Sequence, residues 1–135
     1  MKKISLLAFL LSFIMIGFTS CSKSNSGPSA TTRTLQTQAS TPNVDMMVTF
    51  QASQTGDGTI STLTYTYGST SKTVTNPPLP WSITVSVSAQ DAVSMTATAT
   101  ATNGGASISY DGQGSGGSSS ETITGQDSFT TSSSK

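Results

Sequence analysis

From Met46 onward, apolar and polar residues alternate with a period of two along most of the chain. The alternation is plainest in Val93–Thr102, where Val93, Met95 and three alanines are separated by serine and threonine. Successive side chains of a β-strand point to opposite faces of a sheet, so this pattern predicts strands with one buried face. Outside the N-terminal leader, no stretch has the helical period of about 3.6 residues. An all-β fold is therefore expected.

The predicted strands are short and are separated by turn-forming residues. They are Met46–Ser53, Ile60–Tyr67, Lys72–Thr75, Trp81–Ser88, Val93–Thr102, Ser107–Tyr110 and Glu121–Phe129. About seven strands at this spacing predict an immunoglobulin-like antiparallel β-sandwich over residues 46–130. Ile60 is out of phase with Leu63, which predicts a β-bulge or a late start of that strand.

Glycine-containing segments are expected to connect these strands. Thr55–Gly58 is predicted to be a turn and Asn103–Gly105 a hairpin turn. Residues 112–120 are rich in glycine and serine and are predicted to form a mobile loop. Within them, Gly112–Gly117 superficially resembles a phosphate-binding loop, but it lacks the Lys-Ser/Thr ending and a following helix. A flexible connector is the preferred interpretation.

The first 20 residues have the layout of a secretory signal peptide. Lys2 and Lys3 precede an apolar run from Ile4 to Phe18, and Thr19 and Ser20 follow as small residues. The run is shorter than the roughly 20 residues that a transmembrane helix needs. An uncleaved N-terminal anchor helix is the alternative interpretation.

The only cysteine of the chain, Cys21, comes directly after this leader. Phe18-Thr19-Ser20-Cys21 resembles the lipobox of bacterial lipoproteins. The resemblance implies diacylglyceryl transfer to the Cys21 sulfur and cleavage before Cys21, so that acyl chains hold the protein to a membrane. The alternative is a free cysteine after an ordinary cleavage site. In bacterial lipoproteins, which this segment resembles, an aspartate directly after the cysteine is associated with retention in the inner membrane. Ser22-Lys23-Ser24 contains none, so the resemblance implies the outer membrane in a cell with two membranes.

The segment between Cys21 and the first predicted strand is poor in apolar residues. Leu35 and Val44 are its only large aliphatic residues. Such a composition buries too little apolar surface to offset the entropy of ordering. Residues 21–45 are therefore predicted to be a disordered tether, and residues 131–135 a disordered tail.

The composition argues against several classes of function. Without Lys2 and Lys3, the chain has four basic and six acidic residues, so nucleic-acid binding is not expected. It has no histidine, the commonest general base and metal ligand. Serine and threonine make up 50 of the 135 residues, and no single hydroxyl stands out as a nucleophile. We expect no catalytic residues, no cofactor and no bound metal.

Four aspartates lie near predicted turns and are candidate calcium ligands. They are Asp57, Asp91, Asp111 and Asp127. None has the spacing of a calcium-binding loop, so ordinary turn aspartates are preferred.

The segment around the only tryptophan resembles a known family. Leu79-Pro80-Trp81-Ser82, within Asn76–Val85, is similar to the central motif of the MmpS family of small mycobacterial membrane proteins. The resemblance extends over about Met46–Thr124. It implies an immunoglobulin-like β-sandwich that assists a large RND-type (MmpL-like) transporter in lipid export. In this chain a lipobox replaces the transmembrane helix of the family, and the cysteines typical of its late strands are absent.

The aromatic residues are the remaining candidates for a binding surface. Trp81 is in phase with the buried residues of its strand, which favours a core position over an exposed recognition site. Tyr65, Tyr67 and Tyr110 are candidates for a platform that binds glycans or lipids. The alternative is that aromatic residues simply favour strands.

Together these features predict a lipid-anchored, non-catalytic accessory or interaction protein of the bacterial cell envelope. Its expected contacts are the membrane, through the lipid, and an envelope transporter. The alternative is a surface-exposed, adhesin-like or glycan-binding module. A hydrolase is a weaker third hypothesis, because the chain has no histidine and no nucleophile-elbow motif. The sequence leaves the oligomeric state open.

Overall fold

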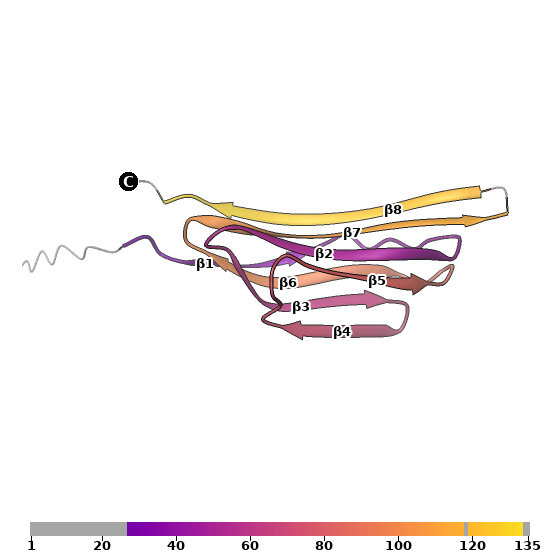
Figure 1. The fold of residues 1–135 in the computed structure, drawn as a ribbon, viewed down its shortest axis with the longest axis horizontal. Coiled ribbons are helices and arrows are strands. Elements are labelled where there is room, and N and C mark those ends of the chain that lie inside the picture. The colour runs from indigo at the N-terminus through magenta and orange to yellow at the C-terminus, as the bar shows by residue number, and fades with distance from the viewer. Residues whose placement is uncertain (1–26, 118, 134–135) are drawn as a thin grey trace, which may run out of the picture.

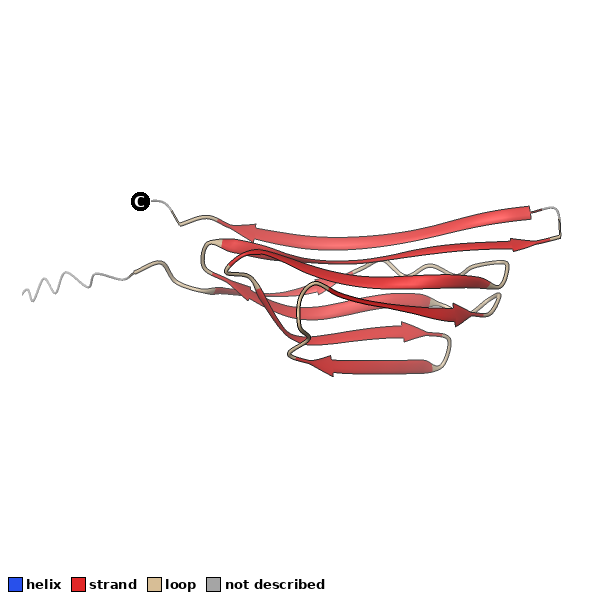
Figure 2. Ribbon diagram, viewed as in Figure 1, coloured by secondary structure: helices blue, strands red, loops and turns tan. Residues whose placement is uncertain are grey.

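The computed structural model describes residues 27–117 and 119–133. Every regular element within them is a β-strand (Figure 2). The strands are β1 (Thr31–Gln36), β2 (Met46–Gly56), β3 (Thr59–Tyr67), β4 (Thr70–Thr75), β5 (Trp81–Val87), β6 (Val93–Ala101), β7 (Gly104–Gly116) and β8 (Ser119–Thr131).

The strands form two antiparallel sheets packed face to face (Figure 1). Sheet A has the order β1-β6-β3-β4, and sheet B has the order β5-β2-β7-β8. The connections β3–β4 and β7–β8 stay within a sheet, whereas every other connection crosses to the opposite sheet. The predicted antiparallel β-sandwich is confirmed, with eight strands instead of seven.

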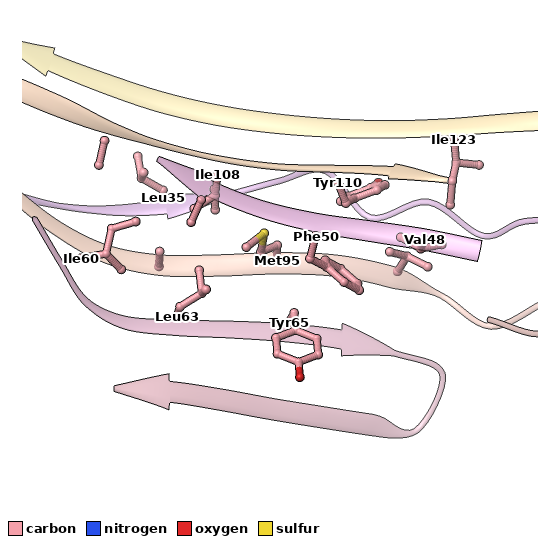
Figure 3. Packing of buried hydrophobic residues seen from close by; sticks show 14 of the residues in the cluster. Leu35, Val48, Phe50, Ile60, Leu63, Tyr65, Met95, Ile108, Tyr110 and Ile123 are labelled. Carbon is pink, nitrogen blue, oxygen red and sulfur yellow. The ribbon is translucent and has the colours of Figure 1, made fainter. Parts of the chain in front are cut away.

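The core forms where the apolar faces of the two sheets meet (Figure 3). Phe50 of β2 is fully buried at its centre, with its ring centroid 5.1 Å from that of Tyr65 and 6.1 Å from that of Tyr110. Every second residue of β6, from Val93 to Ala101, is buried, as the period of two predicts. Alanine at three of these positions lets the sheets approach closely.

The predicted bulge in β3 is confirmed. The pairing of β3 with β6 shifts register between Ile60 and Thr62, so Ser61 is the extra residue. Ile60 and Leu63 are both buried as a result, although three positions separate them. An unbulged strand would expose one of the two.

The predicted disordered tether is wrong from residue 27 onward. Thr31–Gln36 forms the edge strand β1, which pairs with β6 from Ala101 to Thr96. Leu35 is only 1% exposed. Backbone hydrogen bonds to β6 and the burial of this one leucine stabilise a segment whose composition predicts disorder. Residues 21–26 lie outside the described residues.

The connection from β1 to β2 is also ordered by contacts with both sheets. The Thr37 amide donates to the Met95 carbonyl oxygen (2.9 Å), and the Met95 amide donates to Thr37 Oγ1 (2.9 Å). Glu121 of β8 accepts hydrogen bonds from the Asn43 backbone amide (2.7 Å) and side-chain amide (3.2 Å). The folded domain therefore includes residues that the sequence assigns to a linker.

The predicted mobile loop at residues 112–120 is likewise wrong. β7 extends to Gly116 and β8 begins at Ser119, so most of this segment is a paired hairpin. Gly112 lies on the inner face, where a Cβ atom would meet side chains of Ile123, Met46 and Val48 at 2.8–2.9 Å. Glycine is required here because the neighbouring side chains occupy the space. Thr131, assigned to the disordered tail, pairs with Gly104.

The two predicted turns both connect sheets. Thr55–Gly58 is a turn, as expected, with the Gly58 amide donating to the Thr55 carbonyl oxygen (3.1 Å). Asn103–Gly105 is not a hairpin turn, because β6 belongs to sheet A and β7 to sheet B. The Asp57 carboxylate holds the crossing by accepting hydrogen bonds from the amides of Thr102 (3.0 Å) and Asn103 (2.9 Å).

Candidate functional site

The proposed lipidation site, Cys21, lies outside the described residues, and the first described strand begins at Thr31. Thr31, at the start of β1, pairs with Ala101, and Thr131, at the end of β8, pairs with Gly104. Ala101 and Gly104 are only three residues apart, so the start of β1 and the end of β8 lie at the same end of the sandwich. Figure 1 shows this end at the left and the turn of the β7–β8 hairpin at the right. In the described part of the chain, no helix has the length and apolarity to cross a membrane.

The segment Leu79-Pro80-Trp81-Ser82 carries the chain from β4 in sheet A to β5, the edge strand of sheet B. Leu79 and Trp81 are partly buried and pack against the core, whereas Pro80 and Ser82 are exposed. The Trp81 ring lies 5.5 Å from the Tyr65 ring, at an angle of 44°. Trp81 is therefore placed on the inner face, as its phase predicts, but at the rim of the core.

The three tyrosines do not form an exposed platform. Tyr65 and Tyr110 are buried, and only Tyr67, stacked on Tyr65 at 6.3 Å, is partly exposed. The Tyr110 hydroxyl donates to the Gln38 carbonyl oxygen (2.8 Å) and lies 2.7 Å from Ser40 Oγ. The platform hypothesis is wrong for Tyr65 and Tyr110, because their strand positions face the opposite sheet.

A shallow groove beside Trp81 brings together residues that are far apart in the sequence. Its volume is about 220 Å³. Its lining comes from β2, β5, β7 and the residue before β5: Gln51, Ala52, Ser53, Pro80, Trp81, Ser82, Ser107 and Ser109. The Ser53 and Ser107 hydroxyls are hydrogen-bonded to each other at 2.7 Å. The groove lies on the outer face of sheet B, where Gln51 pairs with Ser82 and Ser109, and it presents amide and hydroxyl groups suited to a neutral polar ligand.

Three of the four candidate aspartates make local contacts within the fold. Asp57 holds a sheet crossing, as described above, and Asp127 accepts a hydrogen bond from the Gln36 amide of β1 (2.7 Å). The Asp91 side chain lies against Gly68, and Asp111 is exposed on β7. Among residues 27–117 and 119–133, no three potential ligands gather to hold a metal ion.

The comparisons with known proteins give no relative. No protein-family model matches the chain, and no curated protein or solved structure matches it. The site is therefore interpreted from its own residues.

Proposed function

We propose that this chain is a lipid-anchored protein of the bacterial cell envelope that acts by contact and not by catalysis. The observation that carries the proposal is the short distance in sequence between Cys21 and the folded domain. The Phe18-Thr19-Ser20-Cys21 box follows an apolar leader, and the folded domain begins only ten residues later, at Thr31. Two or three acyl chains on Cys21 would hold such a domain stably at a membrane surface.

The short spacing keeps one end of the domain close to the membrane. Cys21 and Thr31 are ten residues apart in the sequence, so they can be separated by at most about 35 Å. The end of the sandwich that contains Thr31 is therefore the membrane-proximal end. A tether of the length expected from composition would let this end move roughly twice as far from the lipid.

An RND-type transporter is the proposed partner. The support is the resemblance of Leu79-Pro80-Trp81-Ser82 to the MmpS motif, together with the place of these residues. Leu79 lines a small hollow with Gln54 and Thr59, near the membrane-proximal end. Pro80 and Ser82 are exposed at the edge strand β5, where a membrane-embedded partner can reach them.

Site-specific photo-crosslinking in cells tests this proposal. A crosslinking residue at Ser82 is expected to capture a large membrane transporter, identified by mass spectrometry. The matched position is Thr122, which is also an exposed hydroxyl residue on sheet B but lies on the far edge strand toward the other end. Cys21→Ser should abolish the Ser82 crosslink, because the unanchored domain leaves the membrane. Equal capture at Ser82 and Thr122, or capture that persists in Cys21→Ser, would contradict the proposal.

The groove beside Trp81 supports a second candidate, the binding of a neutral glycan. Trp81 is the only tryptophan, so its intrinsic fluorescence reports directly on this groove. Soluble cell-wall glycans should change the emission in a saturable way, and Gln51→Ala should weaken the response. Unchanged emission at millimolar glycan would exclude this candidate.

A further inference from the structure

The outer face of sheet A is a grid of threonines, which we call the threonine face. The strand registers align these residues in rows across the sheet. The rows are Thr32, Thr100, Thr59; then Thr34, Thr98, Thr62, Thr75; then Gln36, Thr96, Thr64, Thr73; and then Ser94, Thr66, Ser71. Every outward position of the four strands is thus threonine, apart from Gln36, the two serines and the bulge residue Ser61.

The threonine face carries no charge. The only charged residues of the sheet A strands are Arg33 and Lys72. Arg33 pairs with Ala99 and Lys72 with Tyr65, so both lie in phase with the core residues and not with the threonines. The outer face of sheet B differs, since Met47 (55% exposed) and Asp111 interrupt its hydroxyl residues.

Hydrogen bonds along the rows hold the side chains in place. Hydroxyl oxygens of neighbouring strands are 2.8 Å apart for Thr32 and Thr100, and 3.0 Å apart for Thr64 and Thr73. The β-branched side chain of threonine is also stiff at χ1. The face is therefore organised before it meets a partner, which lowers the entropic cost of binding.

A trough runs between the rows. It has a volume of about 60 Å³ and is lined by Thr34, Thr62, Thr64, Thr96, Ala97 and Thr98. A water molecule needs roughly 10–15 Å³ of such space, so the trough is large enough for ordered water. Hydroxyl groups from several strands surround this space, which provides the polar partners that an ordered water needs.

The regular distances between the threonines suit a partner whose hydrogen-bonding groups also form a regular array. Neighbouring strands lie about 4.8 Å apart and alternate residues along a strand about 6.7 Å apart. The distance between strands is close to the shorter repeat between oxygen atoms on a prism face of hexagonal ice, and the distance along a strand is somewhat shorter than the longer repeat of that face. The face offers no aromatic or charged group of the kind that orients a soluble ligand. Since sheets twist by about 20–25° per strand, the match is best over neighbouring strands such as β6 and β3.

We propose that the threonine face binds ice. Waters held in the trough and between the rows adopt the lattice of the crystal surface, while the threonine methyl groups fit between them. The surface belongs to sheet A and is separate from the Trp81 groove of sheet B, so this inference does not depend on the proposed transporter or glycan contact.

Ice partitioning tests the proposal. The full chain, purified in detergent, is placed in contact with a slowly growing ice surface, and the protein in the ice is compared with that in the liquid. Wild type should be enriched in the ice over a non-binding protein in the same detergent. Thr98→Tyr places a bulky ring in the middle of a row and should reduce the enrichment about tenfold, which corresponds to ~1.4 kcal/mol.

The matched control is Thr124→Tyr, at an exposed outward position of β8 in sheet B, which should partition like wild type. Thr64→Tyr provides an independent disruption of the grid, and thermal unfolding identifies any variant that has lost its fold. Exclusion of the wild type from ice would overturn the proposal. An equal loss in Thr98→Tyr, Thr64→Tyr and Thr124→Tyr would overturn it as well, because the effect would then not belong to the threonine face.

Discussion

Leu35→Ala is expected to lower the free energy of unfolding of the full chain by about 2–5 kcal/mol, the cost of emptying a buried leucine site. Leu35 is 1% exposed and is the one large aliphatic side chain that β1 contributes to the core. Its loss weakens the docking of an edge strand that covers one side of β6. Denaturant unfolding followed by circular dichroism measures the change.

The control for this prediction is Thr34→Ala, an exposed position on the same strand. It should change the stability by no more than about 0.5 kcal/mol. If Leu35→Ala were as mild as Thr34→Ala, residues 31–36 would behave as the tether that their composition suggests, and the ordered β1 would be refuted.

Gly125→Val is expected to destabilise the protein by about 3 kcal/mol, at the upper end of the usual cost of overpacking. Gly125 pairs with Tyr110 across β7 and β8, and the tyrosine ring fills the space in which a Cβ atom would lie. A valine would force the ring away, with loss of its packing against Phe50 and of its hydrogen bond to Gln38. Thermal unfolding of the variant should show a clearly lower midpoint.

Gln126→Val, at the next residue, provides the comparison because its side chain is exposed. Valine favours strands, so this change should leave the midpoint close to that of wild type. A Gly125→Val midpoint equal to that of Gln126→Val would mean that the tyrosine ring does not lie over Gly125.

The central strands could be predicted because large apolar residues mark their inner faces. In β2 and β5 the alternation of Val48, Phe50, Ile83 and Val85 with hydroxyl residues fixes both the strand and its orientation. The bulge at Ser61 followed from the same logic, since Ile60 and Leu63 cannot both face the core of a regular strand.

Two regions were missed because their inner faces lack large side chains. β1 has a single buried leucine and depends on backbone pairing with β6, which no local pattern reports. In the last part of β7, after Tyr110, the inward positions are Gly112 and Gly114, so the period of two continues there as glycine alternating with polar residues. A glycine-rich strand that packs closely against its neighbours has the same composition as a flexible loop.

The candidate sites were predictable only in part. The phase of Trp81 in its strand correctly placed its side chain on the inner face. The groove beside it was missed, because Gln51, Ser53 and Ser107 meet only through the pairing of β2 with β7. The threonine face was also missed, since its rows exist only once the registers of four strands are known.

The most direct test of the central claim is metabolic labelling of the protein with a clickable fatty acid, followed by membrane fractionation. Wild type should incorporate the label and sediment with the membranes, whereas Cys21→Ser should be unlabelled and soluble. If wild type carried no label, or if both forms fractionated alike, Cys21 would not anchor the β-sandwich and the proposed envelope function would lose its basis.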